Sequence, residues 1–196
     1  MIERQAKIVR ESKETKIELN INLDGAGKYE GDTGIGFFDH MLCLFAKQGL
    51  LDLYVKVKGD LNVDSHHTIE DVGIVLGSAI KEAMKGKEGI KRYGTSFIPM
   101  DETLATVSLD LSGRAFLVFE GNFTVDRLGS FDTEMVEEFF RAVAANAGIT
   151  LHARVIYGKN NHHMVEALFK AFGKALSEAL TYDERIKGVL STKGFL

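Results

Sequence analysis

Hydrophobic and polar residues alternate along two matched stretches of the chain. LLDLYVKVK follows Gly49 and ITLHARVIY follows Gly148, and a second glycine closes each run at the same spacing. Alternation with a period of two predicts a half-buried β-strand in each run. Two earlier alternating runs, IELNINLDG at 17–25 and TVSLDLSG at 106–113, end in a turn glycine and are predicted to be strands as well.

Four other stretches repeat their hydrophobic residues every three or four positions, which is the spacing of an amphipathic helix. FFDHMLCLFAKQ and MVEEFFRAVAAN each precede one of the bracketed strands. Two further helices are predicted to begin at paired histidines, just after the N-cap candidates Asp64-Ser65 and Asn160-Asn161. The order strand–strand–helix–strand–helix is therefore predicted twice, with an extra strand in each copy left open.

The two copies also match residue by residue. HHTIE at 66–70 and HHMVE at 162–166 share a histidine pair and a glutamate. Identical residues follow at equal distances beyond the two pairs: Gly77 and Gly173, Ala79 and Ala175, Glu82 and Glu178, and Ala83 and Ala179. Each copy is too short to bury a sheet face alone. We therefore predict one α+β domain over 1–196, with repeats of about 1–90 and 91–196, sheets outside and helices between them.

Composition mainly excludes other classes of protein. The 196 residues are 45% hydrophobic and 27% charged, as in globular proteins, and the net charge of −4 argues against a nucleic-acid partner. Charged residues interrupt every apolar run before the roughly 18 residues that a membrane helix needs, and the first residues lack a signal-peptide core. The single cysteine, Cys43, is predicted to be a small buried residue. We expect a cytoplasmic protein without membrane partners.

The histidine pairs carry the chemistry. On a helix, His66 or His67 lies beside Glu70, and the second pair has the same relation to its own glutamate. Adjacent helical residues point about 100° apart, so the two histidines of a pair serve two ions, or one ion and the substrate. The spacing matches neither HExxH nor HxxEH, which excludes the zinc-protease patterns.

Two more residues complete a candidate ligand set. His40 lies 26 residues before the first pair, and Glu138 lies 24 residues before the second pair. Eight ligands are therefore predicted, enough for two ions with open positions: His40, His66, His67, Glu70, Glu138, His162, His163 and Glu166. Imidazole with carboxylate and no thiolate favours Mn²⁺, with Fe, Co, Ni and Zn as competitors.

A plainer interpretation is open for each of these histidines. One pair alone would be read as surface histidines at a helix start, but two pairs with the same glutamate offset favour metal binding. His152 has no histidine counterpart in the first copy, and is predicted to lie in the core or to support a ligand.

Taken together, these residues resemble the imidazoleglycerol-phosphate dehydratase family along essentially the whole chain. The matching motifs are RESKET at 10–15, GIGFFDHML at 34–42, DSHHTIED at 64–71, RYG at 92–94, PMDE at 99–102, LDLSGR at 109–114, LHARVIYGKNNHHMVEALFKAF at 151–172 and STKG at 191–194. The resemblance implies ββαββα-type halves like ribosomal protein S5 domain 2, with two four-stranded sheets flanking a layer of helices. It also implies a homo-oligomer of 24 subunits, with two Mn²⁺ per active site at subunit interfaces. Many members have histidine where this chain has Glu138.

The resemblance further implies a reaction, the dehydration of imidazoleglycerol phosphate to imidazoleacetol phosphate in histidine biosynthesis. Two metals on the ring nitrogens favour an imidazolate, which expels the hydroxyl to leave a diazafulvene-like intermediate. Glu14 is then the base that takes the neighbouring carbon-bound proton, and Asp101 is a weaker candidate for the proton of the leaving hydroxyl. Besides Glu14, the implied substrate-binding residues are His40, His66, His67, Arg92, Arg114, His162, His163, Lys170, Ser191 and Lys193.

Two other classes stay open at this point. A dinuclear metallohydrolase would use a metal-activated water, although the chain has no aspartate-rich ligand set. A non-enzymatic metal-bridged shell or metal-storage assembly would use its ions only to join subunits. The C-terminal STKGFL is predicted to be an ordered end near a site rather than a frayed tail.

Overall fold

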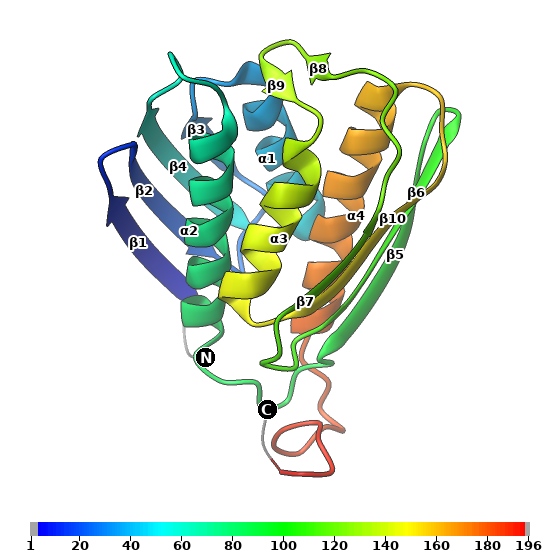
Figure 1. Ribbon diagram of the computed structural model, residues 1–196. Coiled ribbons are helices and arrows are strands. Elements are labelled where there is room, and N and C mark those ends of the chain that lie inside the picture. The colour runs from blue at the N-terminus through cyan, green and yellow to red at the C-terminus, as the bar shows by residue number, and fades with distance from the viewer. Residues whose placement is uncertain (1–3, 195–196) are drawn as a thin grey trace.

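The computed structural model describes residues 4–194, which form helices between two sheets (Figure 1). The first half contains β1 (Gln5–Glu11), β2 (Thr15–Asn22), β3 (Tyr29–Asp32), α1 (Gly36–Gly49), β4 (Asp52–Gly59) and α2 (His66–Met84). The second half contains β5 (Tyr93–Met100), β6 (Thr103–Asp110), β7 (Phe116–Glu120), α3 (Met135–Ala147), β10 (Thr150–Tyr157) and α4 (Asn161–Leu180). A short hairpin precedes α3, formed by β8 (Arg127–Leu128) and β9 (Phe131–Asp132).

Both four-stranded sheets have the same topology. The strand orders are β1-β2-β4-β3 and β5-β6-β10-β7, and in each sheet the last pair is parallel while the other pairs are antiparallel. The extra strand of each half is thus β3 or β7. It comes before the first helix because that helix is the crossover that a parallel strand pair needs. The α+β class with two four-stranded sheets is confirmed, and the implied ββαββα order within each half is corrected to βββαβα.

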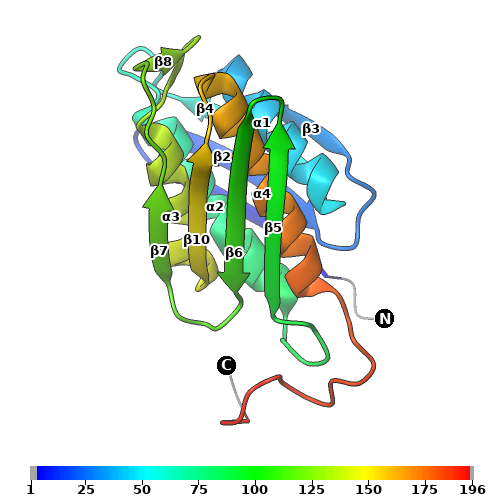
Figure 2. The same ribbon diagram turned by 90° about the vertical axis from the view of Figure 1, so that its right-hand side faces the viewer.

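The helices form the middle layer, with one sheet on either side (Figures 1 and 2). The second helix of each half packs on the first helix of the other half, so that α2 contacts α3 and α4 contacts α1. The repeated glycines allow this close approach. A Cβ on Gly77 would lie 2.6 Å from the carbonyl oxygen of Val143, and one on Gly173 would lie 2.4 Å from that of Phe45. The two halves therefore interlock through their helices.

Buried apolar side chains from both halves form a continuous core. Phenylalanine rings join helices within it: Phe45 stacks on Phe172 at 4.9 Å between centroids, and Phe139 stacks on Phe169 at 5.0 Å. Aromatic pairs of this kind contribute about 0.5–1.5 kcal/mol each beyond the area that they bury. This rigid middle layer carries the helix starts on which the histidine pairs lie.

Two single-residue predictions are wrong. Cys43 is exposed, because it shares the outward face of α1 with His40 and Lys47. His152 is also exposed, because the alternation along β10 buries Leu151 and turns the next side chain to the outer face of the sheet. Within residues 4–194, no helix is long and apolar enough to cross a membrane.

Candidate active site

A side-chain hydrogen bond holds the first histidine of each pair at the start of its helix. The Asp64 carboxylate accepts a hydrogen bond from the backbone N–H of His66 at 2.8 Å, and the Asn160 side chain accepts one from that of His162 at 2.9 Å. Such bonds satisfy N–H groups that a helix start leaves without partners. The paired histidines therefore stand at the same end of α2 and of α4, with their rings turned apart.

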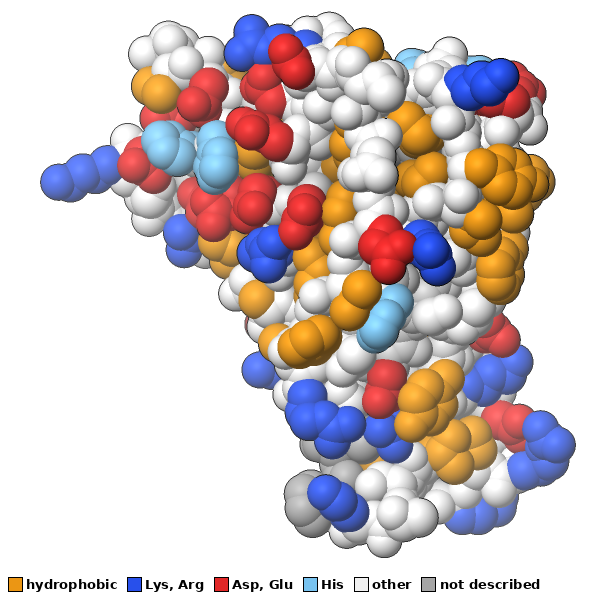
Figure 3. All heavy atoms as spheres, turned by 45° about the vertical axis from the view of Figure 1, so that its right-hand side comes forward, with side chains coloured by type: hydrophobic (Ala, Val, Ile, Leu, Met, Phe, Trp, Pro, Cys, Tyr) orange, Lys and Arg blue, Asp and Glu red, His pale blue; other side chains and the backbone are white. Residues whose placement is uncertain are grey.

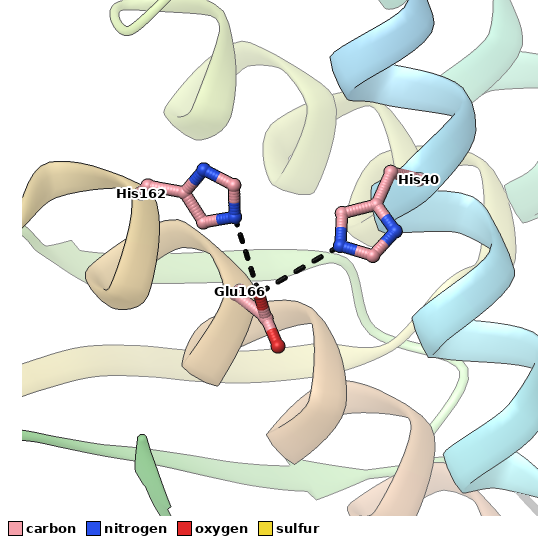
Figure 4. A group of neighbouring side chains, drawn as sticks. All are labelled: His40, His162 and Glu166. Carbon is pink, nitrogen blue, oxygen red and sulfur yellow. Dashed lines mark ion pairs between the residues drawn. The ribbon is translucent and has the colours of Figure 1, made fainter. Parts of the chain in front are cut away.

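His40, His162 and Glu166 form a compact group between α1 and α4 (Figure 4). The Nε2 atoms of His162 and His40 lie 3.2 Å and 3.7 Å from Oε2 of Glu166. One donor atom from each of the three residues fits within 4.8 Å. Ligands about 2.1 Å from one ion and at right angles to each other would be about 3 Å apart, so this donor set fits a divalent metal ion.

Lys170 holds the carboxylate of this group in place. Its Nζ lies 2.5 Å from Oε1 of Glu166, the oxygen that does not face the imidazoles, and 3.5 Å from the Met100 sulfur. Burial would raise the pKa of Glu166, but the hydrogen bond and charge of Lys170 outweigh burial and lower it below its ordinary value. Glu166 is thus kept ionised, with one oxygen directed at the two histidines.

A second group lies at the equivalent place between α2 and α3. The His66 Nε2 is 3.7 Å from Oε2 of Glu70, and a shallow pocket is lined by both His66 and Glu138. Glu138 is also 3.5 Å from the guanidinium of Arg141. The two carboxylates and one imidazole of this group are hard and borderline donors that suit Mn²⁺ or Mg²⁺. The group is looser than the one around Glu166.

His67 lies outside the second group and has two carboxylates around its ring. Its Nδ1 is 3.0 Å from Oδ2 of Asp60, and its Nε2 is 3.9 Å from Oε1 of Glu14. The hydrogen bond to Asp60 is the main reason that the pKa of His67 is raised, and Glu14 adds to it. The structure therefore brings the predicted base Glu14 beside a predicted ligand.

His163 has the corresponding arrangement in the second half. Its Nδ1 is 2.7 Å from Oε2 of Glu102, and its Nε2 is 3.8 Å from Oδ2 of Asp101. The pair with Glu102 raises the pKa of His163 and holds that of the Glu102 carboxyl well below its usual range. Neither Asp60 nor Glu102 was found from the sequence. The repeated ET before β2 and β6, at 14–15 and 102–103, was the available signal for Glu102.

Three of the predicted substrate-binding cations and Ser191 lie together at the other end of the molecule. Arg92, Arg114, Ser191 and Lys193 line one open cavity beside the end of α2 and the C-terminal segment. Figure 3 shows histidines among acidic side chains toward the upper end, and frequent Lys and Arg around the lower end. Arg92 is buried, with Nε and Nη2 bonded to Asp110 at 2.6 and 2.9 Å and Nη1 bonded to the Leu190 carbonyl at 2.7 Å.

One helix length separates the two sets of candidates. His66 begins α2, whereas Met84 ends it and lines the cationic cavity. Its 19 residues span about 28 Å at 1.5 Å per residue. Of the predicted substrate-binding cations, only Lys170 lies at the histidine end. Within one chain, the other cations are too far from the histidines for a small substrate to touch both. The last two residues of the predicted ordered C-terminal segment, 195–196, lie outside the described residues.

Fold and site define a duplicated α+β protein with a candidate metal centre built from histidines and a glutamate. The family model described as imidazoleglycerol-phosphate dehydratase matches residues 33–176. A relative of that name from Clostridium acetobutylicum is 70% identical over 191 residues, which is 97% of each chain. One from Clostridium botulinum (strain Langeland, Type F) is 66% identical over 196 residues, or 100% of each.

Solved structures agree. The crystal structure of the dehydratase from Staphylococcus aureus has a TM-score of 0.83 and 44% identity, and covers 91% of this chain and 99% of its own. The Pyrococcus furiosus enzyme in complex with (S)-C348 has a TM-score of 0.83 and 36% identity, and covers 96% and 100%. The chain belongs to the imidazoleglycerol-phosphate dehydratase family, and is therefore a hydro-lyase.

Proposed function

We propose that this chain dehydrates imidazoleglycerol phosphate to imidazoleacetol phosphate in histidine biosynthesis, in the cytoplasm, with two divalent ions per active site and Mn²⁺ as the favoured ion. Family membership supports the reaction. The observation that carries the metal dependence is the group of His40, His162 and Glu166, whose donor atoms lie within 4.8 Å of one another.

In the proposed reaction, the ions would supply Lewis acidity, and the side chains around them would hold the ions in place. One ion would be held by the group at Glu166 and the other by His66, Glu70 and Glu138, with His67 and His163 as the remaining ligands. When bound, the ions supply Lewis acidity to the ring nitrogens of the substrate, which favours loss of the ring N–H proton. The chain's own part is to hold these donors ionised or neutral as needed, as Lys170 does for Glu166.

Glu14 is the group best suited to take the proton from the substrate carbon. Its side chain is 54% exposed, and no hydrogen bond from residues 4–194 occupies its carboxylate. Once the hydroxyl has left the carbon next to the ring, the diazafulvene-like intermediate has an acidified C–H bond that a carboxylate can deprotonate to the enol. Asp101 is the weaker candidate for the proton of the leaving hydroxyl, and its position 3.8 Å from the Nε2 of His163 supports this role.

The complete site requires more than one copy of the chain. Arg114 and Lys193 are exposed in the cationic cavity and are free to bind a phosphate monoester, with Ser191 as a hydroxyl donor, but the cavity is one helix length from the histidines. Phe97 and Phe116 are 61% and 62% exposed in the single chain. Large exposed aromatic side chains are typical of a surface that another copy of the chain covers. A homo-oligomer, in the family a shell of 24 subunits, would bring one copy's cavity to another copy's histidines.

The Glu14→Gln variant tests the assignment of the base. It keeps the size and shape of the side chain but replaces one carboxylate oxygen with an NH₂ group, which removes its basicity. We expect unchanged metal content and assembly, with kcat lowered by about 10²–10⁴-fold. Normal turnover by this variant would remove Glu14 from the mechanism, and metal binding without any dehydration by the wild-type chain would favour the metal-bridged shell or storage assembly instead.

A further inference from the structure

The two halves place a glutamate at the same point, but use it differently. Glu14 and Glu102 each precede a buried threonine, Thr15 or Thr103, that begins the second strand of its half. Each threonine lies against a glycine of the repeat, either Gly59 at the end of β4 or Gly158 directly after β10. Thr15 pairs with Gly59, and a Cβ on Gly158 would lie 2.5 Å from Oγ1 of Thr103. Glu14 and Glu102 are therefore equivalent positions of the repeat.

The same alignment pairs the residues that follow these two glycines. Asp60 follows Gly59, and Lys159 follows Gly158. The first half thus has two carboxylates around its second histidine, Asp60 on Nδ1 and Glu14 near Nε2. The second half has a lysine in place of Asp60, and Glu102 takes the Nδ1 position instead.

Hydrogen bonds fully occupy Glu102. Its Oε1 accepts the backbone N–H groups of Lys159 at 3.0 Å and Asn160 at 2.7 Å, while Oε2 faces the ring of His163. These bonds stabilise the ionised carboxylate and tie it to the ring of His163, so Glu102 is a poor acceptor for a substrate proton. Glu14 has none of these bonds, because Asp60 already holds the Nδ1 of the neighbouring ring.

We propose that Asp60 and Glu102 are positioning residues that fix the second histidine of each pair with its proton on Nδ1 and its lone pair on Nε2, and that Asp60 thereby leaves Glu14 free to act as the base. The proposal rests on the proposed metal-dependent function. A carboxylate on one ring nitrogen fixes the tautomer of a metal-binding histidine and directs the other nitrogen at the ion.

Asp60 and Glu102 differ in how many of their oxygens accept hydrogen bonds, so their amide variants should behave differently. Within residues 4–194, Oδ1 of Asp60 is buried without a hydrogen-bond partner. In an Asp60→Asn variant the amide can therefore turn its oxygen toward Nδ1–H. Both oxygens of Glu102 are used as acceptors, so in a Glu102→Gln variant the NH₂ group must face either two backbone N–H groups or the ring. Facing the ring, it would force the proton onto Nε2, the atom that the ion needs.

The experiment is a titration of Mn²⁺ into the metal-stripped full chain, with free Mn²⁺ followed by electron paramagnetic resonance. Glu102→Gln should weaken the binding of one ion per chain by about 10–100-fold, and Asp60→Ala should weaken the other to a similar extent. Asp60→Asn should stay within about threefold of the wild type. Glu178→Gln is the matched control, because Glu178 also accepts a backbone N–H, from Thr95, but lies at the far end of α4.

Each outcome decides something. Wild-type affinity in both Glu102→Gln and Asp60→Ala would overturn the positioning role, as would equal losses in Asp60→Asn and Asp60→Ala. If Glu102→Gln does not fold, the comparison of the two Asp60 variants decides alone. A wild-type chain that binds no Mn²⁺ would instead overturn the proposed function, so the two failures are distinguishable. In the turnover assay, Asp60→Ala should lower kcat more than it raises KM. Without Asp60, Glu14 would bond the ring of His67 and would no longer be free to act as the base.

Discussion

Two inactive variants should restore activity to each other if the site is built from separate copies of the chain. Glu14→Gln damages the histidine end, and Arg114→Ala damages the cationic cavity. These residues lie at opposite ends of α2, which is about 28 Å long. In a 1:1 mixed assembly, a site that draws Glu14 from one copy and Arg114 from another has both residues intact in about one quarter of cases.

The assay is turnover of imidazoleglycerol phosphate by co-expressed, co-purified chains with different tags. We expect about 25% of wild-type specific activity from the mixture and a background level from each variant alone. The control for unequal mixing is a 1:1 mixture of wild-type chains with chains that carry both changes. About one quarter of its sites have both residues intact, so it should also show about 25% of wild-type specific activity. Background activity in a mixture that is proven to be mixed would refute the separation of the two ends and place the whole site within one chain.

Two predictions concern the fold itself. Gly173→Ala places a Cβ 2.4 Å from the Phe45 carbonyl oxygen and should lower the unfolding free energy by about 1–3 kcal/mol. Gly36→Ala is the control, because its Cβ meets nothing within 4 Å and should change the unfolding free energy little. Thermal unfolding of the two variants measures the difference. Arg4 lowers the pKa of Asp24 below its ordinary 3.8, chiefly through a hydrogen bond. The ion pair therefore stabilises the fold fully above pH 3.8, and this stabilisation is lost as the pH falls through the lowered pKa. The stability difference between wild type and Asp24→Asn should therefore be constant near pH 6 and shrink in acid; a difference that grows in acid would contradict this.

The sequence pattern predicted the repeat because the same physical requirement acts twice. Gly77 and Gly173 recur because each lets one helix touch the backbone of another. The histidine pairs recur because each stands at a helix start that a preceding polar side chain bonds. The alternating runs gave β2, β4, β6 and β10, the strands with one buried face. β3 and β7 are edge strands of four and five residues with little burial, and no clear alternation marks them.

The candidate site was predictable by residue type but not by position. Distances along the chain could not place Arg114 and Lys193 a helix length from the histidines, because that separation is set by the path of α2 and α4. Asp60 lies in the loop before α2, outside the helical spacing that pointed to the other site residues. Its role depends on a tertiary contact with His67 that no local pattern encodes.

Metal dependence of the dehydration tests the central claim most directly. The protein is stripped with a chelator, Mn²⁺ is added back, and imidazoleacetol phosphate formation is followed together with the metal content per chain. The account predicts no turnover without metal and full turnover near two ions per chain, with Glu138 as a ligand of one. Two bound ions without turnover, or turnover that persists in the stripped protein, would contradict it.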